Sequence, residues 1–180
     1  MPRRPVPPMT AARLEAATRA YLETRTTTRA HLRRLMMRRI DRAIAANGGE
    51  RAPLVAALDA VLDGLERARV IDDAAWAASR ARSLTRRGTS ARGVRAKLAE
   101  KGVASAIVAE VQADSGADDE LRAALVALRR RRAGPFAAER ETVADRRALG
   151  ALARGGFAYA VARRALDMDP DEALERVAQA

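Results

Sequence analysis

The chain lacks cysteine altogether and has one histidine, two lysines and five aromatic side chains among its 180 residues. Without cysteine it forms no disulfide, no thiolate zinc site and no cysteine nucleophile. A single imidazole excludes most histidine-based metal and acid–base sites. No apolar run approaches the roughly 18 residues that a membrane span requires. Residues 1–9 contain four prolines and no apolar stretch, so we expect no secretory signal and a cytoplasmic protein.

Alanine and arginine dominate what is present. There are 44 alanines, and all but two of the 34 basic side chains are arginine. Both residues favour helices, and no segment alternates apolar and polar residues with a period of two. With 48% hydrophobic residues the chain is too apolar to be wholly disordered, but much of that share is alanine. These features predict an all-α fold with a thin core, preceded by a flexible Pro-rich lead-in at residues 1–10.

The net charge of +11 is unevenly distributed along the chain. Residues 1–47, 79–102 and 129–154 carry net charges of +8, +7 and +5, and the segments that follow each of them carry −3, −4 and −2. Solvated helix surfaces in an arginine-rich protein would explain any one of these runs. Three runs at spacings near 50 residues indicate an internal repeat.

The apolar pattern repeats with the charge. Leu35, Leu98 and Leu152 are each followed by apolar residues at offsets of five and nine. In the second and third copies a basic residue and glycine precede the first of these, as Lys101–Gly102 and Arg154–Gly155, which is a typical helix end. The pattern predicts nine helices in three groups of three. The expected groups are residues 11–69, residues 70–115, and residues 116–180 including a C-terminal tail.

Polar residues mark several of the helix starts. Thr28, the pair Asp72–Asp73, and Thr89 or Ser90 are suited to cap helix N-termini. The first helix should cover residues 11–25, and the second should run from Arg29 towards Asn47. The remaining helices are expected around Leu54–Leu65, from Asp72 to Gly88, from Ser90 to Lys101, and at 104–113, 118–132, 139–154 and 158–166.

Four ordered motifs cover about residues 21–166. They are Leu22-x2-Arg25-x2-Thr28-x3-Leu32-x2-Leu35, Val70-Ile71-Asp72-Asp73-x2-Trp76-Ala77, Val94-x3-Leu98-x2-Lys101-Gly102-Val103 and Leu152-x-Arg154-x-Gly156-Phe157. In this order and spacing they resemble the RecX family, which modulates the bacterial RecA recombinase. The chain departs from the family pattern at five places: His31 and Lys97 replace Glu, Arg69 replaces Gly, Thr89-Ser90 replaces part of a Gly-x-Gly turn, and Gly155 replaces Arg.

The resemblance implies a fold of three tandem three-helix repeats in an elongated, curved monomer. It also implies that the protein lies in the helical groove of the RecA filament on single-stranded DNA. There it would damp ATP hydrolysis, strand exchange and co-protease activity, by stiffening the filament, by blocking entry of a second duplex or by capping the growing end. The family is not thought to contain a catalytic group, so we expect no enzyme activity, no cofactor and no metal.

Other conspicuous residues have ordinary structural interpretations. His31 has no second metal-ligating side chain at a suitable spacing and is expected to be a surface residue. The pair Asp72–Asp73 fits helix capping better than acid–base chemistry. Trp76 and Met36–Met37 fit core packing better than base stacking or an adaptable binding patch. Gly155–Gly156 lacks the spacing of a phosphate-binding loop and fits a helix end.

The basic clusters are the candidate partner or nucleic-acid interface, because few acidic residues lie near them in the sequence. The candidate residues are Arg33, Arg34, Arg38, Arg39, Arg86, Arg87, Arg92, Arg95, Lys97, Lys101, Arg129, Arg130, Arg131, Arg132 and Arg154. The alternative to a RecA regulator is a free-standing protein that binds single- or double-stranded DNA through phosphate contacts. No helix offers the Asn and Gln side chains that read bases, and aromatic anchors for a membrane surface are missing.

Overall fold

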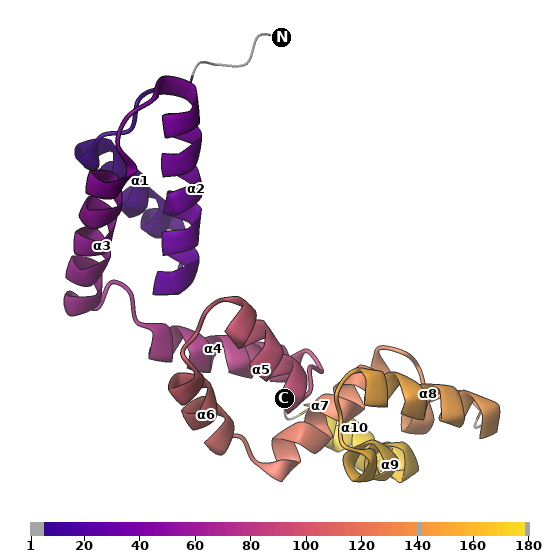
Figure 1. Cartoon of the computed structure of the whole chain (residues 1–180). Helices are drawn as coiled ribbons and strands as arrows, with labels where there is room; N and C mark the ends of the chain where they lie inside the picture. The colour runs from indigo at the N-terminus through magenta and orange to yellow at the C-terminus, as the bar shows by residue number, and fades with distance from the viewer. Residues whose placement is uncertain (1–5, 140–141, 179–180) are drawn as a thin grey trace. The chain divides into compact units, whose positions relative to one another are not determined.

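The computed structural model describes residues 6–139 and 142–178, and this part of the chain is all-α, as predicted (Figure 1). It contains ten α-helices, one 3-10 turn and no strand. The helices are α1 (Ala11–Thr24), α2 (Arg29–Asn47), α3 (Arg51–Arg67), α4 (Asp73–Arg86), α5 (Ala91–Glu100), α6 (Ser105–Ala113), α7 (Ala117–Arg129), α8 (Thr142–Arg154), α9 (Tyr159–Asp167) and α10 (Pro170–Ala178), with the 3-10 turn η1 (Gly134–Phe136) between α7 and α8.

The predicted number of nine helices is wrong, because the chain beyond α9, where a C-terminal tail was predicted, forms α10. Asp169 caps this helix: its Oδ1 accepts the backbone N–H groups of Asp171 at 2.9 Å and Glu172 at 3.2 Å. Proline in the first turn and acidic residues after it also favour a helix start. Ala173 and Val177, four residues apart, are buried and attach α10 to α7.

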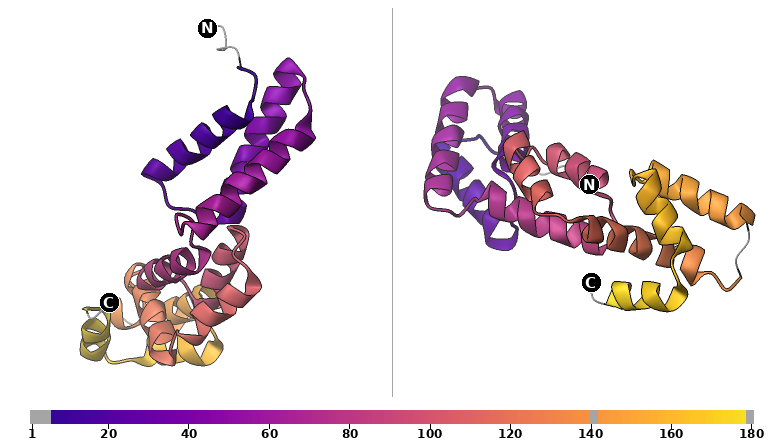
Figure 2. Two further views of the ribbon diagram at one scale, coloured as in Figure 1. Left: turned by 90° about the vertical axis from the view of Figure 1, so that its left-hand side faces the viewer. Right: turned by 90° about the horizontal axis from the view of Figure 1, so that it is seen from below.

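Two compact units make up the described chain. Unit 1 comprises the residues up to Trp76 together with Lys101–Val103, and unit 2 comprises Ala77–Glu100 together with the residues from Ala104 onward. In unit 1, α2 and α3 run side by side in opposite directions and α1 packs against both (Figures 1 and 2). Leucines and isoleucines of these helices form its core around Met36, which is fully buried, with Met37 packed beside it. The core role expected for both methionines is therefore confirmed.

The predicted lead-in of residues 1–10 is only partly within the described residues, because residues 1–5 lie outside them. Residues 6–10 are not helical. Met9 packs against the core of unit 1, and the carbonyl of Val6 accepts a hydrogen bond from Asn47 Nδ2 at 3.0 Å. Thr10 then caps α1 by accepting the N–H of Arg13. The segment from Val6 onward is therefore attached to unit 1.

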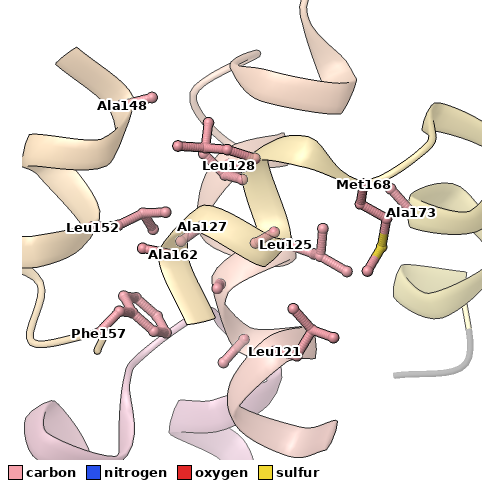
Figure 3. Packing of buried hydrophobic residues seen from close by; sticks show 14 of the residues in the cluster. Leu121, Leu125, Ala127, Leu128, Ala148, Leu152, Phe157, Ala162, Met168 and Ala173 are labelled. Carbon is pink, nitrogen blue, oxygen red and sulfur yellow. The ribbon is translucent and has the colours of Figure 1, made fainter. Parts of the chain in front are cut away.

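Helix α7 is the centre of unit 2 and contributes six buried residues, three of them alanine. Leucines of α7 pack against Leu152 of α8, Ala162 of α9 and Ala173 of α10 (Figure 3). The small side chains permit close approach: a Cβ added to Gly88, which has φ +80°, would lie only 2.9 Å from the backbone nitrogen of Ala127. This contact holds the turn after α4 directly against α7.

A hydrogen-bonded joint occurs once in each unit. In unit 1, Thr28 Oγ1 accepts the N–H of His31 and donates to the carbonyl of Lys101 at 2.6 Å. In unit 2, Ser90 Oγ accepts the N–H of Gly93 and donates to the carbonyl of Gly155, also at 2.6 Å. The two hydroxyls thus cap helices, as predicted for Thr28 and for one of Thr89 and Ser90. Each also satisfies a carbonyl at the end of a distant helix.

A carboxylate completes each joint by accepting the N–H of the next residue. Asp73 Oδ1 accepts from the backbone of Arg29 at 2.8 Å, and Glu120 Oε2 accepts from that of Ala91 at 2.7 Å. Asp72, the other half of the acidic pair, caps α4 through the N–H of Ala75. The capping role predicted for Asp72–Asp73 is confirmed for Asp72, whereas Asp73 caps α2.

Removing the Ser90 hydroxyl should be costly, because it takes part in two hydrogen bonds of a fully buried side chain. We expect Ser90→Ala to lower the free energy of unfolding by about 1–3 kcal/mol, the usual cost of a lost cap and an unsatisfied carbonyl. Urea unfolding followed by circular dichroism measures it. Ser105→Ala, at an exposed residue of α6, is the matched control. Equal stability of the two variants would contradict a role for the joint.

Glu120 makes the stability of unit 2, at the hydrogen-bonded joint of Ser90, depend on pH. Burial raises the pKa of its carboxyl, and the hydrogen bond from Ala91 opposes the shift. Because the folded state then holds the proton more tightly than the unfolded state, this group contributes less to stability as pH rises. Glu120→Gln removes the titration and keeps an oxygen that accepts from Ala91.

We therefore expect the stability of Glu120→Gln relative to the wild type to rise as the pH increases above about 4, where an ordinary Glu carboxyl loses its proton, and to level off once the raised pKa of Glu120 is passed. Thermal unfolding at several pH values measures the difference. Glu175→Gln, at an exposed residue of α10, controls for the loss of a negative charge. A Glu120→Gln difference that is constant with pH, or that shrinks as pH rises, would count against the buried carboxyl.

Candidate functional site

The structure removes Arg33 from the expected set of unpaired cations. Its Nε and Nη2 contact the two carboxylate oxygens of Asp59 at 2.7 and 3.0 Å. The bidentate pair raises the pKa of Arg33 and lowers the pKa of Asp59. The prediction of too few nearby carboxylates is wrong here, because α3 runs antiparallel to α2 and brings the acid from 26 residues away.

Arg29 is paired in the same way on the neighbouring turn. Its guanidinium contacts Asp63 at 2.7 Å and Glu66 at 2.8 Å. The acidic side of α3 therefore neutralises one side of α2. Two other arginines of α2, Arg38 and Arg39, form no ion pair with any residue that the structure describes.

Four basic side chains gather in unit 1 beside the first joint. His31, Arg34 and Arg38 lie three and four residues apart and share one face of α2. The bond from Thr28 to the carbonyl of Lys101 brings Lys101 to the same end of the helix. Burial lowers the pKa of His31, and the charges of Lys101, Arg34 and Arg38 lower it further. We call these four residues the α2 basic cluster.

Three members of the α2 basic cluster, Arg34, Arg38 and Lys101, are among the predicted interface residues, and the fourth, His31, is not. His31 was expected to be an ordinary surface residue, but it is half-buried among cations. Its spacing from Arg34 and Arg38 was the available signal. Arg39 is separate from the cluster, since it lines a different hollow with Arg13, Arg42 and residues 6–9. In the described residues, neither Arg38 nor Lys101 forms an ion pair.

In unit 2 the structure brings together the ends of α4 and α7. Nη1 of Arg130 donates to the carbonyl of Arg87 at 3.1 Å, because the Gly88 turn rests on α7. Arg131 Nη1 donates a hydrogen bond to the carbonyl of Ala127 at 3.0 Å, so this side chain satisfies a carbonyl in the last turn of α7. Arg87 and Arg130 make no ion pair with any residue that the structure describes. We call them the Arg87–Arg130 pair.

The basic residues of α5 do not form one patch. Arg95 donates to Gln112 Oε1 of α6 at 2.8 Å. Arg92 lies against the turn that follows Arg154: a Cβ added to Gly156 would be 3.2 Å from Cβ of Arg92. Lys97 is exposed. Arg86, Arg129, Arg132 and Arg154 are likewise exposed, and of these Arg86 lines a groove between α4, α6 and α7.

No other site type stands out in the described part of the chain. Its His, Asp and Glu side chains form no group of three or more that could hold a metal ion. None of its helices combines the length and apolarity that crossing a membrane requires. Trp76 is half-buried on α4. The unpaired cations of the two units are thus the surface features to explain.

Known proteins are similar to this chain in sequence or in fold. A family model described as the second three-helix domain of RecX matches residues 72–111. The chain is 37% identical over 160 residues to the regulatory protein RecX of Myxococcus xanthus (strain DK1622), covering 87% of this chain and 86% of that protein.

Two solved structures have the same fold. A crystal structure of regulatory protein RecX matches with a TM-score of 0.64 at 18% identity, over 88% of this chain and 72% of that one. RecX from Lactobacillus salivarius matches with a TM-score of 0.61 at 14% identity, over 94% and 97%. At these identities the structures support the fold alone, whereas the sequence match extends over most of both proteins.

Proposed function

The chain belongs to the RecX family, and on this premise we propose that it binds the RecA filament on single-stranded DNA and inhibits its ATPase, strand-exchange and co-protease activities. The regulatory role rests on the match to a regulatory protein over most of its length. We propose that the protein acts by binding, as a monomer in the cytoplasm, and carries out no catalysis of its own.

The α2 basic cluster is the observation that carries the proposal. Its charged members lie close enough to His31 that, besides burial, the charges of Lys101, Arg34 and Arg38 lower the pKa of its imidazole. Two of its members, Arg38 and Lys101, have no acidic partner among the described residues. A concentrated positive surface of this kind favours an acidic protein groove or a row of phosphates.

Unit 2 would add a second contact through the Arg87–Arg130 pair. Each unit would then contact the filament through its own basic residues. Repeat proteins commonly bind their partners through extended surfaces of this kind. A ligand that bridges neighbouring filament subunits favours the filament state to which it binds best. It would thereby oppose the conformational cycle that ATP hydrolysis requires.

The alternative is direct DNA binding. Exposed arginines at the end of α7, Arg129, Arg130 and Arg132, favour it because phosphate groups can reach them. The two functions differ in stoichiometry. RecA hydrolysis dependent on single-stranded DNA should be measured while this protein is titrated well below the concentration of DNA sites, with RecA in excess. Inhibition at substoichiometric protein supports filament binding. Inhibition only when the DNA is covered, with a steep dependence on salt, supports the alternative.

A further inference from the structure

Unit 2 contains a groove that the RecA-filament proposal does not use. It has a volume of about 410 Å³, within the range of small-ligand and side-chain pockets. The groove lies between α4, α6 and α7. Its lining residues are Ala78, Ala81, Arg82, Thr85, Arg86, Val111, Asp114, Ser115, Asp119 and Arg122.

Three arginines line the groove together with small apolar side chains. Arg82 and Arg86 lie four residues apart on α4 and therefore project on one side of the helix. Neither forms an ion pair with a described residue. Ala78 and Ala81 of the same helix, with Val111 of α6, supply the apolar floor.

Arg122 of α7 is incompletely satisfied. One of its terminal nitrogens contacts Asp119 Oδ1 at 3.1 Å, and Asp119 also accepts the N–H of Gly116. The Nε of Arg122 is buried and has no hydrogen-bond partner. Buried polar groups without a partner are uncommon in folded proteins. A carboxylate that entered the groove could satisfy a reoriented Arg122 with the two-pronged geometry that guanidinium groups prefer.

We propose that this groove binds an acidic segment of a partner protein. One Glu or Asp side chain would meet Arg82, Arg86 and Arg122, and a small apolar neighbour would lie on the alanine floor. Asp114 and Asp119 line the same groove, so a single carboxylate placed at the three arginines fits it better than a continuous row of negative charges, such as the phosphates of a nucleic acid. The proposal rests on the proposed function only for the identity of the protein that carries the segment.

The test uses the full chain and a labelled synthetic peptide of alternating Glu and Ala, with binding followed by fluorescence anisotropy. The same peptide with Gln in place of Glu and a single-stranded oligonucleotide are the comparison probes. Two variants change the groove independently: Arg82→Glu reverses a charge, and Ala78→Phe fills the space. Arg164→Glu and Ala74→Phe make the same changes at exposed residues outside it.

We expect each groove variant to bind the Glu peptide about tenfold or more weakly, equivalent to about 1.4 kcal/mol, and both control variants to bind as the wild type does. The Gln peptide should bind weakly to every form. Unchanged circular dichroism shows that the variants are folded. Peptide binding that survives both groove variants overturns the proposal, as does a preference of the groove for the oligonucleotide. Failure of RecA inhibition while peptide binding remains intact overturns only the proposed function.

Discussion

Reversing the charges of Arg38 and Lys101 together is expected to weaken inhibition of the RecA ATPase by about a hundredfold. Each reversal turns an attraction to an acidic or phosphate surface into a repulsion, and a change of about 1.4 kcal/mol at each site corresponds to tenfold in affinity. Both side chains belong to the α2 basic cluster and lack an ion-pair partner among the described residues. The measurement is the protein concentration that halves RecA hydrolysis of ATP on single-stranded DNA.

The matched control is the double variant Arg67→Glu and Arg164→Glu. It changes the net charge by the same amount at exposed residues of α3 and α9. Equal loss of inhibition in both double variants would show that net charge matters and that the cluster does not. Raising the salt concentration should narrow the difference between wild type and the cluster variant, because salt screens exposed charges.

Leu125→Ala is expected to destabilise unit 2 by about 3 kcal/mol, within the usual range of about 2–5 kcal/mol for such a substitution. Leu125 has no exposed surface and lies at the centre of the core, between neighbours contributed by several helices (Figure 3). Much of the surrounding core is alanine, which cannot rearrange to fill the space left by a leucine side chain. The cavity therefore persists, and its cost adds to the loss of buried apolar surface.

Chemical denaturation followed by circular dichroism measures this effect as a lower midpoint. Val126→Ala, at the adjacent half-buried residue of the same helix, should cost clearly less. Similar losses in the two variants would contradict a special cost of the cavity at the centre of unit 2. The comparison is informative because alanine favours helices in both positions, so helix propensity does not cause a loss of stability in either variant.

Local signals in the sequence predicted most helix boundaries. Thr28 and Ser90 stand where a cap was expected, and Lys101–Gly102 stands where a helix end was expected. These features depend on neighbours within four residues, which the sequence displays directly. The same kind of signal at Asp169–Glu172 marks the start of α10, so that helix was predictable although nine helices were expected.

The candidate surface depended on distant neighbours. Arg33 and Arg38 look alike in the sequence, yet Arg33 is paired with Asp59 whereas Arg38 belongs to the α2 basic cluster. Which side of α2 an arginine occupies follows from helical spacing, but which side meets the acids of α3 follows only from packing. The groove lined by Arg82, Arg86 and Arg122 could not be predicted from the sequence for the same reason, because its lining residues meet only when the helices pack.

The sequence by itself determined the all-α class, the positions of most caps and helix ends, and the membership of the RecX family. Those properties follow from short-range propensities and from motif order. The tertiary structure alone decided which cations remain unpaired, that Thr28 and Ser90 each join two helices, and that three arginines share one groove. Charge pairing and joint formation require side chains that lie tens of residues apart to meet, and only the packed helices bring them within a few ångströms.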